Sequence, residues 1–363
     1  MVQYRSFEVW RSTVRRLVGP TPCRRPSLHA IFDGCDQGGS VSQAAREHDP
    51  TLKVIVTARE QLADDVIGLQ FEDPTGAPLP RWSPGAHVDV ILDSTLVRQY
   101  SLCSSPADPY RWRIGVLLEP DGRGGSRRVH DELRPGSHVE LRGPRNHFEL
   151  RPSPGYRFIA GGIGITPILP MIEAAEAAGA DWSLLYGGRR RSSMSFLDQL
   201  SEHPDRVSIW PQDERGLPNL DEALGEVAED TLIYCCGPEG LLGAVERASA
   251  HWPASALHVE RFAAKPAEPP PSDALERFEV VCQRSGFSVE VGPDETILDA
   301  VRSRGIDMLS SCMEGICGTC ETPVLEGIPD HRDSVLDEEE HAANDAMMLC
   351  VSRSLSARLV LDL

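Results

Sequence analysis

Three cysteines lie within nine residues near the carboxyl end of the chain. Cys312, Cys317 and Cys320 have the spacing C-x4-C-x2-C, and Cys350 follows after 29 further residues. A glycine lies in each gap of the triplet. Three sulfurs on so short a loop can face one centre only if the backbone bends sharply, which glycine permits. The spacing therefore predicts a small domain built around a metal centre or a cross-linked loop.

Three kinds of cysteine site can be compared with this spacing. It is the pattern of plant-type 2Fe-2S centres, in which four thiolates hold two irons. A structural zinc site usually presents two matched pairs, and Cys317 and Cys320 have no matching pair near Cys350. Disulfides need an oxidising compartment, and no signal-peptide-like apolar segment stands at the amino end. We therefore predict a 2Fe-2S cluster on Cys312, Cys317, Cys320 and Cys350, and expect the other six cysteines to be small buried hydrophobes.

The pattern of apolar residues divides the chain into segments. Residues 1–49 are Arg-rich and interrupted by Pro and Gly, which predicts an extension outside the domains. Six short strand-like runs in 50–150 predict an antiparallel β-barrel. Strands alternate with helices in 151–264, which predicts a parallel sheet wrapped by helices. Four prolines within nine residues mark 265–274 as a semi-rigid linker, and 275–363 then form a small α+β domain.

Inside the last segment a hairpin and one helix are predicted. Ser285-Gly286 joins two strand-like runs. Asp294 stands at a candidate N-cap, the apolar residues from Ile297 to Val301 give one face of the helix, and Gly305 ends it.

The chain is strongly acidic. Its net charge is -19 at pH 7, and residues 273–363 alone hold 19 acidic and 7 basic side chains. Nucleic acids are bound by clustered Lys and Arg, so we expect no nucleic-acid partner. No apolar run reaches the roughly 18 residues of a membrane-spanning helix, so we expect no membrane partner. We also expect a cytoplasmic protein and a monomer. The acidic run 337–340 is either a solvated surface or a docking surface for a basic partner.

A 2Fe-2S centre takes one electron at a time, whereas nicotinamide cofactors deliver hydride. A flavin can divide the electron pair, so the chain should hold a flavin site. In the barrel segment, Arg98-Gln99-Tyr100-Ser101 offers an Arg for a phosphate, an aromatic ring and a small hydroxyl. The turn Gly122-Arg123-Gly124-Gly125-Ser126 precedes a predicted helix and would present backbone N–H groups to a phosphate.

A nucleotide site is indicated in the parallel-sheet segment. The stretch from Gly161 to Pro167 follows a strand and opens a helix, although Thr166-Pro167 replaces the third glycine of the usual fingerprint. Cys236-Gly237-Pro238 ends another strand at the same edge of the predicted sheet and could border a nicotinamide. Packing alone is the other interpretation of the cysteine pair Cys235-Cys236.

The chain resembles one protein family over about residues 51–363. The motifs that carry the resemblance occur in the order RQYSL, GRGGS, GGIGITPI, YCCGPEG, ERF and CMEGICGTC. The family is the phthalate dioxygenase reductase and vanillate demethylase reductase group of the ferredoxin-NADP reductase superfamily. The resemblance implies an FMN barrel domain, an NAD(P) domain and a β-grasp ferredoxin domain. It also implies electron flow from NADH through FMN and the 2Fe-2S cluster to a Rieske-type terminal oxygenase.

The resemblance also implies roles for individual residues. No catalytic acid or base is expected, because hydride passes directly to the flavin. Leu117 and Leu118 stand where relatives often carry a basic residue, and we expect Arg123 to supply that charge to the phosphate. The expected FMN site consists of Arg98, Tyr100, Ser101, Gly124, Gly125, Ser126 and Phe262. The expected NAD(P)H site consists of Gly162, Gly164, Thr166, Arg189, Cys236, Gly237 and Pro238.

Two choices stay open at this point. Arg189-Arg190-Arg191 follows the second strand of the sheet, where an acidic residue would favour NADH and Arg190 could pair with the 2′-phosphate of NADPH; we expect NADH. The partner could be a haem-thiolate monooxygenase in place of a Rieske oxygenase. A redox-sensing binding module is a further alternative, although a sensor needs no route for hydride.

Overall fold

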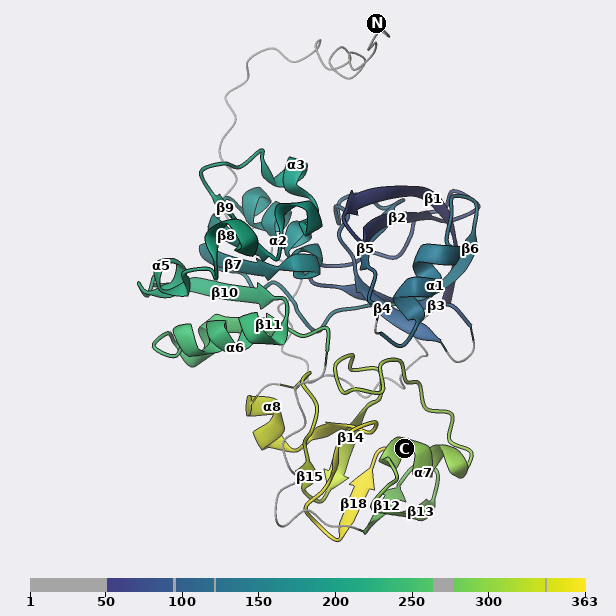
Figure 1. Cartoon of the computed structure of the whole chain (residues 1–363). Helices are drawn as coiled ribbons and strands as arrows, with labels where there is room; N and C mark the ends of the chain where they lie inside the picture. Colours follow the sequence, from purple (N-terminus) through teal and green to yellow (C-terminus); the bar gives the residue numbers. More distant parts are fainter. Residues whose placement is uncertain (1–50, 94–95, 121, 264–276, 337) are drawn as a thin grey trace, which may run out of the picture. The chain divides into compact units, whose positions relative to one another are not determined.

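Three main β-sheets follow one another along the chain in the computed structural model (Figure 1). The predictions for residues 1–49, for the linker 265–274 and for Asp337 lie outside the described residues. The main sheets lie within the expected ranges 50–150, 151–264 and 275–363, whose limits stay predictions. The structure describes residues 51–93, 96–120, 122–263, 277–336 and 338–363, all within the unit His48–Leu363.

The first sheet is the predicted antiparallel barrel. Its order is β4-β3-β6-β1-β2-β5, and a bridge between Leu102 and Ile114 joins the two end strands. Alternate residues such as Val54 and Val56 are fully buried in its core, and each such side chain contributes roughly 1.5–3 kcal/mol. The elements are β1 (Thr51–Ala63), β2 (Val66–Glu72), β3 (His87–Ile91), β4 (Val97–Ser101), β5 (Trp112–Leu117), α1 (Gly125–Glu132) and β6 (His138–Arg145).

The second sheet is parallel throughout, in the order β11-β10-β7-β8-β9. Phe158 packs into the core that contains helix α2, whereas its neighbour Ile159 packs into the core that contains helix α6. Because successive side chains of a strand face opposite sides, the two helices cover opposite faces. The elements are β7 (Gly155–Gly161), α2 (Ile165–Ala178), β8 (Asp181–Gly188), α3 (Leu197–Leu200), β9 (Val207–Pro211), α4 (Gln212–Arg215), α5 (Leu220–Leu224), β10 (Thr231–Cys236), α6 (Glu239–Ala248) and β11 (Leu257–Glu260).

The third sheet has the order β13-β12-β18-β14-β16, with β18 parallel to β12 and antiparallel to β14. This mixed sheet with one main helix is the predicted β-grasp ferredoxin domain. The helix cap was predicted wrongly: the hydroxyl of Thr296, not Asp294, accepts the amide of Asp299 at 3.0 Å. The elements are β12 (Phe278–Cys282), β13 (Phe287–Val291), α7 (Ile297–Ser303), β14 (Glu321–Glu326), β15 (Pro329–Asp330), α8 (Glu338–Ala343), β16 (Ala346–Met348), β17 (Arg353–Ser354) and β18 (Arg358–Leu361).

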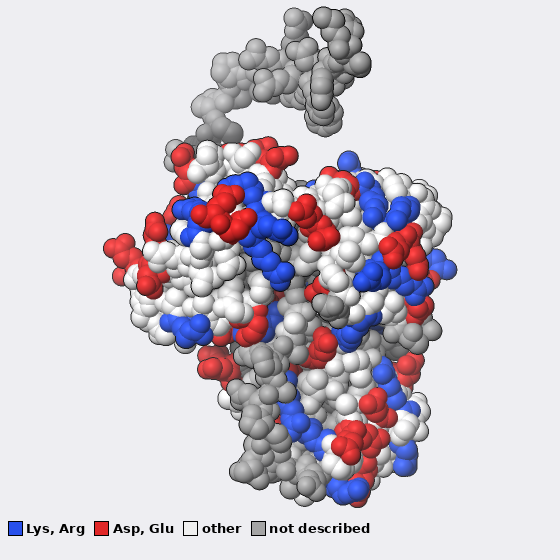
Figure 2. All heavy atoms as spheres, viewed as in Figure 1, with Lys and Arg blue, Asp and Glu red and all other residues white. Residues whose placement is uncertain are grey.

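The described surface carries charges of both signs. On the face shown in Figure 2, acidic and basic side chains lie intermixed over the described residues. That face shows both signs of charge rather than the single-sign basic footprint of a nucleic-acid-binding surface.

Candidate active site

The four predicted cluster ligands are buried and form no disulfide. Cys312, Cys317 and Cys320 lie on the loop between α7 and β14, and Cys350 follows β16. The amides of Glu314 and Ile316 donate to Cys312 Sγ at 3.3 and 3.5 Å. Two glycines of the loop have φ near +66° and +68°, a backbone conformation that other residues adopt only with strain.

The sulfurs lie close enough to perturb one another. The pKa of the Cys312 thiol is lowered because Cys317 and Cys350 donate hydrogen bonds to its sulfur. The pKa of Cys320 is also lowered, by a hydrogen bond from Cys350. Four buried sulfurs in mutual contact, with amides pointing at one of them, fit a 2Fe-2S cluster, whose irons would neutralise the thiolates.

A second group of ligand-type side chains lies beside this loop. The ligand atoms of His331, Asp333 and His341 lie within 4.8 Å of one another. The two imidazole rings are stacked, however, with centroids 4.5 Å apart and planes 21° apart. Because a metal binds in the plane of an imidazole ring, two nearly parallel rings do not converge on one ion. Ser334, which follows Asp333 in the chain, donates its amide to the Gly315 carbonyl at 2.8 Å. The segment that carries this group of side chains therefore supports the cluster loop.

Burial of Asp333 raises the pKa of its carboxyl, but the opposing contributions are larger. The imidazole of His331, two backbone amides and the charge of His341 favour the carboxylate, and the pKa of Asp333 is lowered as a result. Asp333 is therefore an ionised anchor under the cluster loop at neutral pH.

One cavity of about 340 Å³ contains most of the expected flavin site. Residues from the barrel, from the parallel-sheet domain and from the cluster loop line it together. Gly124, which was also expected there, does not line the cavity; it lies at the N-cap of α1 with φ 80°. The expected residues that line the cavity are Arg98, Tyr100, Ser101, Gly125, Ser126, Phe262 and Thr166.

The polar end of this cavity is built on strand β4 and helix α1. Arg98 lies against Gly125 so closely that a Cβ there would be 2.4 Å from Arg98 Cγ, so only glycine fits. Ser126 Oγ accepts the amide of Glu119 at 3.0 Å, which leaves the hydroxyl hydrogen available for a ligand. A cation, a hydroxyl and the amino end of a helix are the groups that bind a phosphate. Burial raises the pKa of Tyr100, so its phenol stays neutral.

Arg123 contacts the cluster loop as well as the cavity, and its expected role at the phosphate stays a prediction. Its guanidinium lines the cavity, but Nη1 donates to the Cys312 carbonyl at 2.9 Å and Nη2 lies 3.2 Å from the Glu314 carboxylate. The acidic side chain and the carbonyl of the cluster loop compete for this charge. Arg123 therefore contacts the ferredoxin domain, and Arg98 remains the candidate for the phosphate.

Sequence reasoning missed Glu260, which lines the cavity beside Cys236. The thiol of Cys236 donates to Glu260 Oε2 at 3.7 Å, because the two residues pair across β10 and β11. Burial raises the pKa of the Glu260 carboxyl to about 8. The adjacent Arg261 pairs with Glu239 and Glu246 of α6 at 3.2 and 2.5 Å, which fixes this segment. The only signal in the sequence was the position of Glu260 in the ERF motif.

Most of the expected nucleotide residues meet at the carboxyl edge of β7 and β10. The turn η2 (Gly162–Gly164) follows β7, and α2 begins at once after it. A Cβ on Gly164 would lie 2.3 Å from the Cys236 carbonyl oxygen, so glycine is required for the close approach of the two loops. Gly237 and Pro238 lie between β10 and α6. Of this set, Thr166 alone lines the flavin cavity.

Arg189 lies apart from these residues. It follows β8 and is exposed, as is Arg190. Among the described residues neither forms an ion pair, whereas Arg191 pairs with Glu214 at 2.9 Å.

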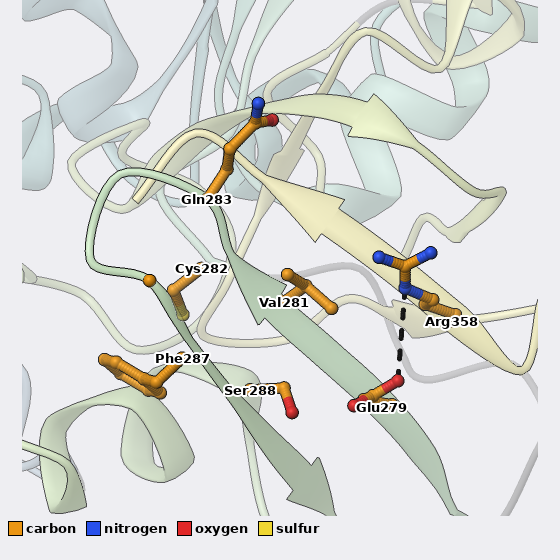
Figure 3. Close-up of a pocket in the computed structure, with 8 residues that line it drawn as sticks. Glu279, Val281, Cys282, Gln283, Phe287, Ser288 and Arg358 are labelled. Atoms are coloured by element: carbon orange, nitrogen blue, oxygen red, sulfur yellow. Dashed lines mark ion pairs between the residues drawn. The ribbon is translucent and has the colours of Figure 1, made fainter.

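A shallow depression on the ferredoxin domain is a different feature (Figure 3). An ion pair within it joins Glu279 and Arg358 at 4.0 Å across β12 and β18. In Figure 3 the side chain of Gln283 points away from this ion pair. None of the predicted site residues lies there, and we assign it no function.

Family models match three successive parts of the chain. They are an oxidoreductase FAD-binding domain over residues 53–150, an oxidoreductase NAD-binding domain over 158–247 and a 2Fe-2S iron-sulfur cluster binding domain over 280–355. Phenoxybenzoate dioxygenase subunit beta of Ectopseudomonas oleovorans is 43% identical over 304 residues, covering 83% of this chain and 94% of that protein. The chain belongs to the phthalate dioxygenase reductase family. The resemblance inferred from the motifs is confirmed.

Solved structures place this reductase among close structural neighbours. An intact type IV self-sufficient cytochrome P450 monooxygenase is 43% identical with a TM-score of 0.81; the match covers 89% of the reductase but only 43% of the P450 chain. Phthalate dioxygenase reductase, described as modular for electron transfer from pyridine nucleotides to [2Fe-2S], is 34% identical with a TM-score of 0.64, covering 86% and 98% of the two chains. Among the described residues, no helix is long and apolar enough to cross a membrane.

Proposed function

We propose that this reductase passes electrons from NADH through FMN and a 2Fe-2S cluster to a Rieske-type terminal oxygenase. One observation carries the proposal. Cys312 of the cluster loop and Tyr100 and Ser126 of the expected flavin site line the same cavity. An electron leaving a flavin there would reach a cluster ligand without crossing an intervening segment of the chain.

The residues of the chain position the cofactors. A bound flavin accepts hydride and releases electrons singly, so no protein acid or base is needed for the transfer. We assign the phosphate to Arg98, to Ser126 and to the amino end of α1. Tyr100 and Ser101 would border the ring, and Phe262, which is 41% exposed, would cover it where the nicotinamide enters.

The nucleotide would lie along the edge formed by β7 and β10. The glycines at 162 and 164 let its phosphates approach the amino end of α2. Glu260 lines the cavity and Cys236 donates to its carboxylate, so we place both beside the position where the nicotinamide would meet the flavin. We retain NADH as the donor on the family resemblance; Arg191 is paired with Glu214, whereas Arg190, the candidate for a 2′-phosphate, is exposed. A higher kcat/KM with NADPH in initial-rate assays would overturn this choice.

An anaerobic titration with NADH tests the redox chain. The purified protein should contain about two irons and about one FMN per chain, released and identified by mass spectrometry. NADH should bleach the flavin first and the cluster afterwards in stopped-flow absorbance. A preparation made without oxygen that lacks iron, or that holds FAD, would contradict the corresponding part of the proposal.

The partner is an oxygenase component, as the relatives indicate. Phenoxybenzoate dioxygenase subunit beta and the phthalate and vanillate reductases bear names of oxygenase systems. The Rieske type rests on the family resemblance. The acidic helix α8 supports a docking role for the ferredoxin domain, since Glu338, Glu339 and Glu340 occupy its first turn.

A haem-thiolate monooxygenase is the second candidate partner, because the reductase resembles the P450-linked chain over 89% of its own length. The two candidates can be separated by offering the NADH-reduced protein a Rieske oxygenase and a cytochrome P450 in parallel. Faster reduction of the haem than of the Rieske centre would favour the second candidate.

A further inference from the structure

Arg123 joins two distant parts of the chain. It lies in the glycine-rich turn before α1, and its Nη1 donates to the carbonyl of Cys312, 189 residues away, at 2.9 Å. Its Nη2 lies 3.2 Å from the carboxylate of Glu314. The guanidinium therefore holds the main chain at a predicted cluster ligand and the side chain two residues beyond it.

The main chain of Arg123 is held from the other side. Arg98 Nη2 donates to the Arg123 carbonyl at 2.9 Å, and the Arg98 side chain packs over Gly125. Arg98 lies on β4, next to Tyr100 in the expected flavin site. Arg123 thus connects the turn that would hold the flavin phosphate with the loop that would hold the cluster.

A second contact fixes the cluster loop one residue before Cys312. Ser311 Oγ donates to Asp89 Oδ1 at 3.2 Å. The Asp89 side chain is fully buried and is held by Arg142 and Arg145 at 2.9 and 2.6 Å. Because this acceptor is rigidly held in the barrel, it limits where Ser311 can lie.

A third contact lies on the far side of the loop. A Cβ on Gly318 would be 2.4 Å from His147 Nε2, so the imidazole packs directly on the loop backbone. The loop therefore contacts the barrel before, at and after Cys312. Among these contacts, only those of Arg123 also reach the glycine-rich turn.

We propose that Arg123 is a positioning residue that holds the Cys312 side of the cluster loop against the flavin site and so sets the rate of electron transfer from flavin to cluster. The inference rests on the proposed function. Each transfer oxidises the flavin by one electron and reduces one ferric iron of the cluster to ferrous iron. No bond to the protein forms or breaks, and protons lost by the flavin pass to solvent.

The physical basis is a charge-assisted hydrogen bond. Such bonds are about twice as strong as neutral ones, and the one to the Cys312 carbonyl acts on the backbone that carries the sulfur. The ion pair with Glu314 contributes less, because the two side chains are 52% and 37% exposed and salt screens them. Electron transfer weakens steeply with distance, so a small displacement of the loop is enough to slow it.

The test compares Arg123→Ala and Arg123→Lys with the parent protein, all loaded with FMN and cluster. Arg134→Ala is the matched control, since Arg134 is an exposed barrel arginine whose guanidinium donates to the nearby carbonyls of His130 and Leu133. Anaerobic stopped-flow absorbance follows flavin reduction by NADH and cluster reduction separately. In the Arg123→Ala protein we expect unchanged flavin reduction and electron transfer to the cluster slowed about tenfold, equivalent to about 1.4 kcal/mol in activation free energy.

Two further readouts separate positioning from other roles. NADH–ferricyanide activity, which draws electrons at the flavin, should stay unchanged while NADH–cytochrome c activity falls. Hydrogen exchange of the amides in 311–320 should accelerate in Arg123→Ala even in flavin-free protein, and Arg123→Lys should recover part of both losses.

Three results would overturn the inference or its basis. Unchanged electron transfer in Arg123→Ala would remove the positioning role. Loss of FMN from that variant would show instead that Arg123 binds the phosphate. If the parent protein itself passes no electrons from NADH to its cluster, the proposed function fails, whatever the variants show.

Discussion

Replacing Glu260 with glutamine should make the stability of the reductase less dependent on pH. The pKa of the Glu260 carboxyl is raised from 4.5 to about 8 by burial. The folded protein therefore keeps this proton between about pH 4.5 and pH 8, whereas the unfolded chain has released it. Because the unfolded state binds fewer protons in this window, stability falls as the pH rises through it and levels off above about pH 8.

The size of the effect follows from the shift. The pKa of Glu260 is raised by about 3.5, and a pKa difference of one corresponds to about 1.4 kcal/mol, so the free energy of unfolding changes by at most about 5 kcal/mol over this pH range. Glu260 lines a cavity and is only partly buried, so we discount this to about 2–4 kcal/mol. Glutamine cannot ionise, so the Glu260→Gln protein should match the parent near pH 5 and exceed its Tm by about 6–12 °C at pH 8.5.

Thermal unfolding of the FMN-loaded proteins, followed by circular dichroism from pH 5 to 9, measures this difference. Glu202→Gln is the control, because Glu202 is exposed and lies away from the cavity. Parallel Tm curves for the parent and the Glu260→Gln protein across the window would refute the reasoning. A difference that grows toward low pH would show that the sign is wrong.

Three other substitutions test separate parts of the site. Cys350→Ser should remove the cluster, so iron content and NADH–cytochrome c activity should fall while NADH–ferricyanide activity persists; retained iron would exclude Cys350 as a ligand. Gly164→Ala puts a methyl group 2.3 Å from the Cys236 carbonyl oxygen, so the KM for the nucleotide should rise about tenfold while the FMN content stays unchanged. An unaltered KM would contradict the close approach of the two loops. Asp333→Asn removes a carboxylate whose pKa is lowered, so at pH 7 urea unfolding should show a loss of about 1–3 kcal/mol. That loss should shrink as the pH falls below about 4 and vanish once the pH lies below the lowered pKa of the folded carboxyl, where the parent side chain is protonated as well; a constant loss would mean that charge is not involved.

The three sheets, and the loop that brings the expected cluster cysteines together, could be predicted because their signals are local. The spacing from Cys312 to Cys320 is set by a single loop, and strand alternation is visible within each run of residues. The flavin motif around Arg98 and Ser126 is local in the same sense, since each piece is one turn or one strand. The sequence also placed one helix cap at Asp294, two residues too early, because both Asp and Thr are good caps and the choice depends on the turn before the helix.

The contacts between domains could not be predicted in this way. Arg123 and Cys312 are 189 residues apart, and Asp89 and Ser311 are 222 apart. Nothing near Arg123 in the chain distinguishes a contact with the cluster loop from a contact with a phosphate. Glu260 was missed for a related reason, because the burial that raises its pKa arises only in the folded chain and cannot be read from its neighbours in sequence.

The buried cysteines outside the cluster have a practical consequence. Cys103, Cys235, Cys236 and Cys282 are buried, and burial raises the pKa of each thiol. At neutral pH these sulfurs stay protonated and sheltered, so peroxide formed when a reduced flavin meets oxygen has little to attack there. Oxidative damage should instead begin at the four cluster sulfurs once iron is lost. A thiol-reactive dye added to the folded protein would therefore report the fraction of molecules that have lost their cluster, above a constant background from any reactive thiol at Cys23 or Cys35.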